Sequence, residues 1–176
     1  FKVDGNKKIL RYNDTRRFGA VIWTDNNPFN HKLIATLGPE PLSDEFNADY
    51  LFEIVKRKKQ PIKSTIMDSH SVVGVGNIYA NESLFLASIR PQRRSQKIKK
   101  NEISILVDSI KMVIQKAITR GGSTLNDFYS VNGKSGYFQN EHNVYGRENE
   151  SCNKCDGTIY QLRIAQRSSF YCKKCQ

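Results

Sequence analysis

The four cysteines of this chain lie in its last 25 residues and form two pairs with the same internal spacing. Cys152 and Cys155 make one C-x-x-C pair, Cys172 and Cys175 make the other, and 16 residues separate them. This spacing is typical of a four-cysteine zinc site. Each pair offers two thiolates from one tight turn, and four thiolates complete a tetrahedral shell with no open position. The pattern therefore predicts one structural Zn²⁺ ion.

Two other chemistries use paired cysteines: a pair of disulfides, or a redox-active C-x-x-C motif. A redox motif needs one pair, whereas this chain has two. No signal peptide is recognisable, so we expect a reducing cytoplasm, in which thiols stay free to bind metal. Zinc is the favoured interpretation.

The residues between the two cysteine pairs predict a β-hairpin. Residues 158–164 and 168–171 have the composition of strands, and Gln166 and Arg167 are expected at or near the turn. A hairpin that is held by metal and carries a basic tip is typical of a binding device.

The composition points to a polyanionic partner. The chain has 176 residues, with 28 Lys and Arg against 17 Asp and Glu, a net charge of +11 and a pI near 9.6. Such an excess is typical of nucleic-acid binding. There is no apolar run long enough to span a membrane and no long basic amphipathic helix, so no membrane partner is expected. Residues 90–100 form a basic stretch without acids, interpreted as a solvated linker.

The pattern of the chain predicts β structure followed by helices. Residues 1–24 are expected to be β structure. Polar and apolar side chains alternate at 8–12, and residues 18–23 are apolar enough for a packed strand. The sequence Gly-Pro-Glu-Pro at 38–41 is a stiff break before a helical region. Helices are expected from Asp44 or Asn47 to about Lys59, over 62–67, over 78–89, and from Asn101 to Arg120. The last helix is expected to bury an apolar stripe on one face, formed by Ile103, Leu106, Val107, Ile110, Val113, Ile114 and Ala117.

Three short stretches could contact nucleic acid. In Arg16-Arg17-Phe18, two guanidiniums beside an aromatic ring can pair with bases and wedge between them, although the triplet alone favours a solvated turn with one core phenylalanine. The basic run 56–59 either contacts phosphate or compensates a helix dipole. The glycines before Asn77 permit close approach of the backbone to a phosphate. They do not form a dinucleotide site, because the third glycine of that motif is missing.

Taken together, these stretches resemble the bacterial formamidopyrimidine-DNA glycosylase family. The matching segments read LRYNDTRRFG at 10–19, LGPEPLSD at 37–44, IK at 62–63, VVGVGNIYANE at 72–82, GGSTLNDF at 121–128 and AQRSSFYC at 165–172. They span nearly the whole chain in family order. The related endonuclease VIII branch shares part of this architecture, but the RRFG and AQR elements look more like the formamidopyrimidine branch.

The resemblance implies an α+β fold in three parts. Residues 1–40 would be the end of an N-terminal β-sandwich domain. Residues 41–145 would form a helical helix–two-turn–helix DNA-binding domain, and residues 146–176 a zinc finger built on the four-cysteine β-hairpin. The segment 121–138 resembles a flexible loop that closes over an extruded base.

The resemblance also implies roles for single residues. Arg16 would enter the duplex and pair with the base opposite a flipped lesion, and Phe18 would wedge beside it. Arg167 at the hairpin tip would hold phosphates and assist strand cleavage. Three further residues would grip phosphates around the flipped nucleotide: Lys59, Lys63 and Asn77. Flipping costs a few kcal/mol, which a kinked backbone and an intercalated plug offset.

The implied function is base-excision repair. The complete protein would be a monomeric DNA glycosylase and abasic-site lyase, acting with the nucleoid in a bacterial cytoplasm. It would remove oxidised purines (8-oxoguanine and formamidopyrimidines) from duplex DNA that contains a damaged base or an abasic site. Its one cofactor would be a structural Zn²⁺ ion.

The sequence departs from the family pattern in three places. Thr15 stands where the family has proline, and Ser135 stands where it usually has proline. Both changes would loosen a turn without removing a contact group. The family nucleophile is an N-terminal proline followed by a glutamate on a preceding domain. No residue of this chain matches that proline, so we expect a truncated chain that binds DNA but does not excise a base. The alternative functions are a non-catalytic zinc-hairpin module for damaged or distorted DNA, and an RNA-binding zinc ribbon.

Overall fold

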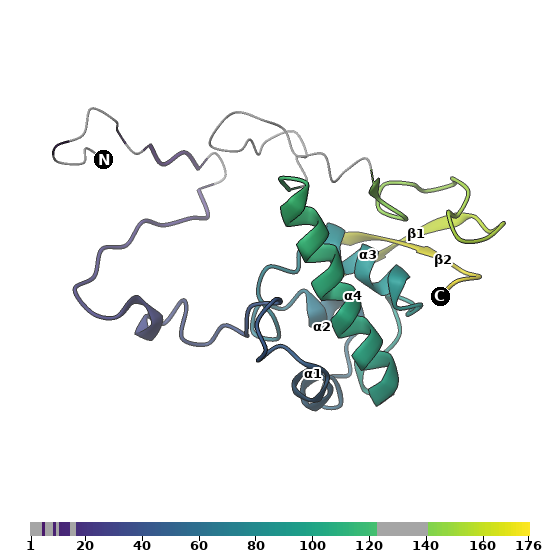
Figure 1. The fold of residues 1–176 in the computed structure, drawn as a ribbon, viewed down its shortest axis with the longest axis horizontal. Coiled ribbons are helices and arrows are strands. Elements are labelled where there is room, and N and C mark those ends of the chain that lie inside the picture. The colour runs from purple at the N-terminus through teal and green to yellow at the C-terminus, as the bar shows by residue number, and fades with distance from the viewer. Residues whose placement is uncertain (1–4, 6–8, 10, 15–16, 123–140) are drawn as a thin grey trace. The chain divides into compact units, whose positions relative to one another are not determined.

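The computed structural model describes residues 5, 9, 11–14, 17–122 and 141–176. The chain divides into two compact units, Phe1–Ala35 and Thr36–Gln176. The second unit contains every labelled helix and strand of Figure 1. Its boundary with the first unit lies just before the Gly-Pro-Glu-Pro stretch.

The described residues of the first unit form one short 3-10 helix, η1 (Pro28–Asn30), and no strand. The prediction of a packed strand at 18–23 is therefore wrong. Phe18 is 86% exposed and Trp23 is 90% exposed. An apolar strand is stable only when neighbouring strands supply hydrogen bonds and a surface that covers its side chains. The described part of this unit supplies neither.

The second unit is built on four α-helices. They are α1 (Ala48–Val55), α2 (Ile62–Ile66), α3 (Asn77–Leu86) and α4 (Lys100–Thr119), with a 3-10 turn η2 (Ser95–Lys97) before the last. Helices were expected at all four places, and the core between them is formed by their apolar side chains together with Phe46, Val72, Ile89 and Ile98. None of the described helices is long and apolar enough to cross a membrane.

Two helices end earlier than expected, each for a local reason. The side-chain oxygen of Asn47 caps α1 as predicted, accepting the N–H of Tyr50 at 3.0 Å. The helix stops at Val55 rather than near Lys59 because the N–H groups of Arg57 and Lys58 bond only three residues back, to the carbonyls of Ile54 and Val55. α3 stops at Leu86 because Ser88 turns to a positive φ of 56°.

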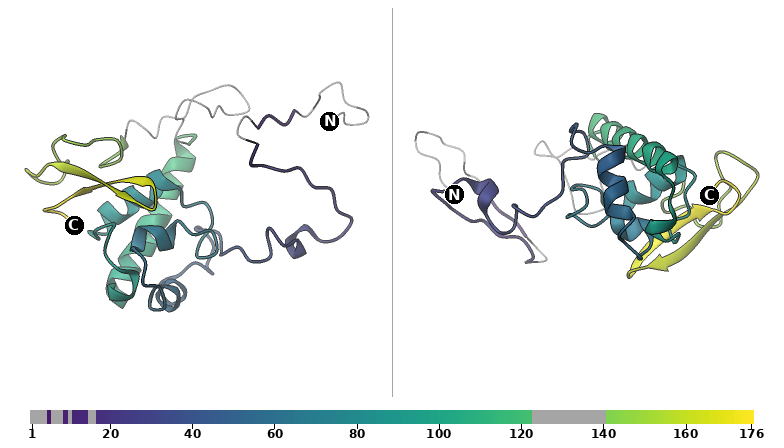
Figure 2. Two further views of the ribbon diagram at one scale, coloured as in Figure 1. Left: turned by 180° about the vertical axis from the view of Figure 1, so that it is seen from behind. Right: turned by 90° about the horizontal axis from the view of Figure 1, so that it is seen from below.

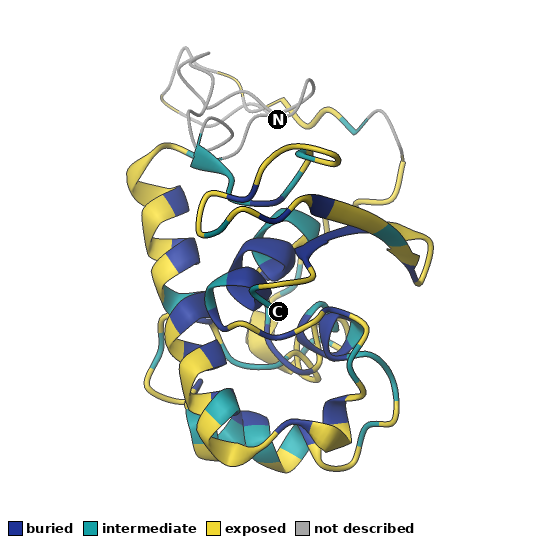
Figure 3. Ribbon diagram, turned by 90° about the vertical axis from the view of Figure 1, so that its right-hand side faces the viewer, coloured by how far each residue is buried: buried dark blue, intermediate teal, exposed yellow. Residues whose placement is uncertain are grey.

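α4 is the longest element and carries the predicted apolar stripe, all of which is buried. Figure 3 shows this helix with one buried and one exposed face. It begins at Lys100, so Asn101 is not its cap: the Glu102 carboxylate accepts the N–H of Lys99 at 2.8 Å and fixes the start two residues earlier. Gly121 and Gly122, with φ of 74° and 90°, end the helix as predicted.

The hairpin consists of β1 (Ile159–Ile164) and β2 (Arg167–Cys172), paired antiparallel from Ile159–Cys172 to Ile164–Arg167. Ala165 and Gln166 make the turn between them, at φ of 45° and 62°. Gln166 therefore lies in the turn and Arg167 directly after it, as predicted. The views in Figures 1 and 2 place β2 alongside α3. A second core cluster joins the two elements through Phe85, Val144, Ile159 and Phe170.

Candidate metal centre and nucleic-acid interface

The four cysteine Sγ atoms lie within 4.8 Å of one another. The separations are 3.7 Å between Cys152 and Cys175, 3.6 Å between Cys155 and Cys172, and 3.4 Å between Cys155 and Cys175. Four sulfur ligands at about 2.3 Å from a tetrahedral metal lie about 3.8 Å apart, whereas a disulfide holds its sulfurs about 2.05 Å apart. The cluster can hold a metal ion, and all four cysteines are free thiols.

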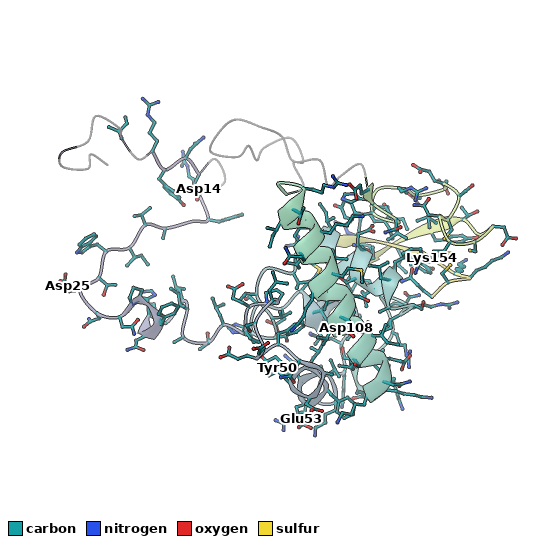
Figure 4. All side chains as sticks on the ribbon, viewed as in Figure 1. Asp14, Asp25, Tyr50, Glu53, Asp108 and Lys154 are labelled. Atoms are coloured by element: carbon teal, nitrogen blue, oxygen red, sulfur yellow. The ribbon has the colours of Figure 1, made fainter. Side chains whose placement is uncertain are left out.

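The first cysteine turn is shaped for thiolate ligands. The N–H of Lys154 points to Cys152 Sγ at 3.4 Å, and the N–H of Gly157 points to Cys155 Sγ at 3.3 Å. A Cβ at Gly157 would lie 3.1 Å from Cys172 Sγ, so glycine leaves room for the cluster to close. The side chain of Lys154, labelled in Figure 4, lies with its Nζ 4.8 Å from the ring centre of Phe85 on α3.

The tip of the hairpin is held by a buried lysine. Lys63 on α2 is 1% exposed, and its Nζ donates to the carbonyl of Ser168 at 2.7 Å and to Ser169 Oγ at 2.6 Å. Burial, together with the positive charge of Arg167, lowers the pKa of Lys63 to about 8. Both acceptors belong to β2, directly after Arg167, so α2 and the tip form one structure.

Lys63 and Arg167 line the same shallow pocket, with Ser64, Met67, Ile164 and Ala165. Neither cation has a carboxylate within ion-pair distance among the described residues. Two neighbouring cations without an acid repel each other, and an anion placed between them would relieve that repulsion. The pocket is therefore suited to a phosphate.

Asn81 is a site residue that the sequence analysis did not identify. It is fully buried on α3, where its Nδ2 donates to the carbonyl of Asn77 at 2.7 Å and its Oδ1 accepts the N–H of Phe170 on β2 at 2.7 Å. Lys63 and Asn81 thus bind consecutive residues of β2 from two helices. The side chain of Asn81 connects the start of α3 to the strand that carries Arg167.

Asn77 is the first residue of α3, as expected. Its Oδ1 is buried and has no hydrogen-bond partner among the described residues. No side chain caps the preceding Gly76 position, so the first turn of α3 presents backbone N–H groups that need an acceptor. An unsatisfied helix N-terminus of this kind favours an anion.

Glu82, next to Asn81, is a second buried residue without an assigned role in the sequence analysis. Its carboxylate is 1% exposed and accepts four hydrogen bonds, from the N–H groups of Asn143, Val144 and Tyr145 and from Asn143 Nδ2, at 2.8–3.0 Å. The segment 143–145 then packs on the hairpin, where the rings of Tyr145 and Phe170 lie 5.1 Å apart. In the sequence Glu82 is one of three consecutive polar residues of α3, 81–83, and nothing there marks it as buried.

The other predicted contact residues are not among those that line this pocket. Lys59 is exposed in the segment between α1 and α2. Phe18 is in the first unit, next to a turn in which Asp14 Oδ2 accepts the N–H of Gly19 at 2.6 Å. Arg16 and most of the predicted loop 121–138 lie outside the described residues.

Comparison with known proteins yields one family and close relatives. The sequence profile of the formamidopyrimidine-DNA glycosylase H2TH domain matches residues 37–129. A formamidopyrimidine-DNA glycosylase of Neisseria meningitidis is 49% identical over 168 residues, which is 96% of this chain and 61% of that relative.

Solved structures give the same likeness. The MutM (Fpg) protein of Thermus thermophilus superposes with a TM-score of 0.86 at 36% identity, covering 93% of this chain and 62% of that one. The Fpg of Lactococcus lactis, in complex with DNA that contains an abasic site, superposes with a TM-score of 0.75 at 36% identity, covering 82% of this chain and 53% of that one. This chain spans less than two thirds of the length of each of these relatives.

Proposed function

We propose, because this chain belongs to the formamidopyrimidine-DNA glycosylase family, that it is the DNA-binding part of a base-excision repair enzyme. The complete protein would be a DNA glycosylase and abasic-site lyase that removes oxidised purines from duplex DNA. Its work would take place in a bacterial cytoplasm, where it would act as a monomer on nucleoid DNA. The abasic-site DNA bound by the Lactococcus lactis relative supports the choice of partner.

The observation that carries this proposal is the pocket at the hairpin tip. Lys63 and Arg167 meet there without a carboxylate partner, and Asn81 connects the strand of Arg167 to the uncapped start of α3. A distorted sugar–phosphate backbone would place its phosphates against these cations and N–H groups. Asn77 would contribute its side chain at the helix start. Arg16 and Phe18 would fill the space that a flipped nucleotide leaves.

The metal in the cysteine cluster would be zinc. Four thiolates with tetrahedral spacing are the donor set of a structural zinc site, and no coordination position remains for a substrate. The metal would hold the hairpin together, and DNA would be bound by protein groups alone.

The proposal is tested by separating binding from excision. A 176-residue polypeptide should bind duplex DNA containing 8-oxoguanine or an abasic-site analogue more tightly than undamaged duplex. It should leave the base in place and give no covalent product with borohydride, because no residue in it matches the family's secondary-amine nucleophile. The same residues joined to the amino-terminal domain of a relative should excise and be trapped. Equal affinity for damaged and undamaged duplex would contradict the proposal.

A single arginine supplies a sharper comparison. Arg167→Ala should weaken lesion binding by about 1–3 kcal/mol, the scale of a charge-assisted hydrogen bond. Arg163→Ala is the matched control, because Arg163 is exposed on the neighbouring strand opposite Ser168. Equal losses from the two substitutions would mean that only net charge matters at the hairpin.

A further inference from the structure

We propose that this chain carries a second duplex-binding surface, which holds the phosphates of undamaged DNA beside the lesion. We call it the basic ridge and define it as Lys59, Arg94, Lys97 and Lys99. The proposal rests on the proposed function, since it takes duplex DNA as the partner. It adds a lesion-independent contact outside the pocket of Lys63 and Arg167. It also places Lys59, which the resemblance assigned to the phosphates around the flipped nucleotide, among the flanking phosphates.

The ridge exists because two basic segments are joined through their backbones. Every residue of 56–59 is basic, as are five of the eight residues of 93–100. The N–H of Ser95 donates to the carbonyl of Gln60 at 3.0 Å, and Pro61 and Arg94 form an antiparallel bridge. Segments that are distant in the sequence therefore lie side by side.

A buried serine fixes this arrangement. Ser95 is fully buried, and its Oγ donates to the carbonyl of Gln60 at 2.8 Å and lies 2.8 Å from Thr65 Oγ1 on α2. Cations on such a backbone have fixed spacing. The interpretation of residues 90–100 as a solvated linker is therefore wrong for this part, because its backbone is anchored on both sides of Ser95.

The acids around the two segments are already paired. Glu53, labelled on α1 in Figure 4, contacts Lys56 and lies 3.5 Å from Arg57. The other three pairs are Lys58–Asp68 at 3.4 Å, Arg93–Glu102 at 2.5 Å and Lys100–Asp49 at 2.6 Å.

Four cations of the two segments form no ion pair within the described residues. Lys59, Arg94, Lys97 and Lys99 are all exposed, and among the described residues none has a carboxylate within 4.0 Å. These four are the ridge. Their charge is available to an external partner.

The ridge continues the surface of the hairpin tip. Pro61, which pairs with Arg94, directly precedes α2, and Lys63 on α2 reaches the strand of Arg167. The ridge is therefore joined through α2 to the strand that carries Arg167, and Lys63 between them is buried. Duplex DNA presents about one charge per 1.7 Å of its axis, which suits a row of cations better than a single phosphate group would.

The other polyanions fit less well. Firm binding to an anionic membrane surface adds exposed apolar side chains to the charges, and Ile98, the apolar residue of the segment 93–100, is 3% exposed. Single-stranded nucleic acid needs aromatic rings for stacking, and the segments 56–61 and 93–100 contain none. The ridge offers charge alone, so it should hold a duplex backbone without regard to sequence or damage.

The test compares two triple variants that each remove three positive charges. One is Arg94→Ala, Lys97→Ala, Lys99→Ala in the ridge. The other is Lys154→Ala, Lys173→Ala, Lys174→Ala at the cysteine end of the hairpin. Binding is measured by fluorescence anisotropy from 50 to 300 mM salt, with undamaged and abasic-site duplexes of 12 and 30 base pairs. Thermal unfolding and metal content are recorded for each variant.

We expect the ridge variant to flatten the log–log salt slope by about 2–3 on the 30-base-pair duplex, since each lost phosphate contact contributes about 0.9. The change should be smaller on the 12-base-pair duplex and the same for undamaged and abasic-site DNA. The ratio of the two affinities should therefore stay constant. The control variant should change the slope by less than 1.

Three results would overturn the proposal that the ridge binds duplex DNA. They are an unchanged slope, an equal change in both triple variants, or a loss confined to single-stranded RNA or anionic vesicles. If the parent binds lesion DNA selectively while the ridge variant keeps its slope, the ridge fails and the proposed function stands. If the parent does not distinguish damaged from undamaged duplex but the ridge slope falls, the proposed function fails and the ridge stands.

Discussion

The two ends of the hairpin are fixed by different means. At the cysteine end, all four possible metal ligands come from residues 152–175 of the same short segment. At the tip, the described residues contain no comparable cluster, and β2 is held by Lys63 from α2 and Asn81 from α3. The cysteine end is also joined to the segment after α3, where Arg90 donates to the carbonyls of Lys173 and Gln176. Its distinguishing feature is the cluster of metal ligands, whereas the tip is held by side chains of the helices alone.

The stability of the hairpin and the position of its tip therefore depend on different groups. A metal bound by local ligands can fold a small hairpin by itself, because binding free energy becomes folding free energy. It does not determine where the tip points. The helices do that, through buried polar side chains that each hold β2 by one or two hydrogen bonds. The tip can therefore be displaced by changes that leave the metal site intact.

The largest expected effect is loss of the metal. A chelator, or Cys172→Ser, should unfold residues 152–175, because structural zinc supplies on the order of 10 kcal/mol to comparable small domains. Metal analysis should give one zinc per chain, and hydrogen exchange should show lost protection in β1 and β2. Asn153→Ser is the matched control, since Asn153 is exposed between the first two cysteines. A hairpin that stays ordered without metal would contradict the comparison.

Glu82→Gln should have the next largest effect. The carboxylate accepts four hydrogen bonds, and an amide would turn an NH₂ group toward N–H donors. We expect a loss of about 3 kcal/mol in the free energy of unfolding, with metal content unchanged. Denaturant unfolding measures it. Glu148→Gln is the control, because Glu148 is exposed; similar losses would refute a specific role for Glu82.

Asn81→Ala should weaken the tip without affecting the cysteine end. It leaves the N–H of Phe170 and the carbonyl of Asn77 without their partner, which costs about 1–3 kcal/mol. Hydrogen exchange should increase at Phe170 before it increases near the cysteines, and lesion binding should fall with metal content unchanged. Asn101→Ala, at an exposed position of α4, should change neither.

The smallest effect is a pH dependence that belongs to Lys63. Its pKa is lowered to about 8 in the folded chain by burial and by Arg167, against an ordinary value of 10.5. Between these values the unfolded chain binds more protons, so stability from this group should rise with pH, by at most about 1.4 kcal/mol per unit.

The measurement is the difference in unfolding free energy between the parent and Lys63→Met at pH 7.5, 8.5 and 9.5. The difference should move in favour of the parent as the pH rises, while groups common to both chains cancel. A difference that is constant with pH would mean that Lys63 titrates in the ordinary range despite its burial.

The sequence predicted elements whose signals are local. The stripe of α4, the Asn47 cap, the closing glycines and the cysteine spacing each depend on residues a few positions apart, and the structure confirms them. The resemblance identified Lys63, Asn77 and Arg167, and their roles in DNA binding remain predictions. The pocket shared by Lys63 and Arg167 could not be derived from spacing, because more than a hundred residues separate them.

What the sequence did not predict depends on partners distant along the chain. Asn81 and Glu82 look like ordinary helix residues until β2 and the segment 143–145 pack against them. Ser95 likewise becomes significant only beside Gln60. The strand expected at 18–23 failed for the opposite reason: its apolar pattern was suitable, but the described residues around it offer no partner strand.

The turn at the tip has a consequence for the rigidity of the hairpin. Ala165 and Gln166 both adopt positive φ, a conformation that costs a non-glycine residue about 1 kcal/mol and that a glycine would adopt freely. Glycine would also widen the range of shapes open to the unfolded loop and to the tip itself. The hairpin thus gives up some equilibrium stability for a turn with few alternative conformations, so that Arg167 is held in a narrow range of directions before any ligand arrives.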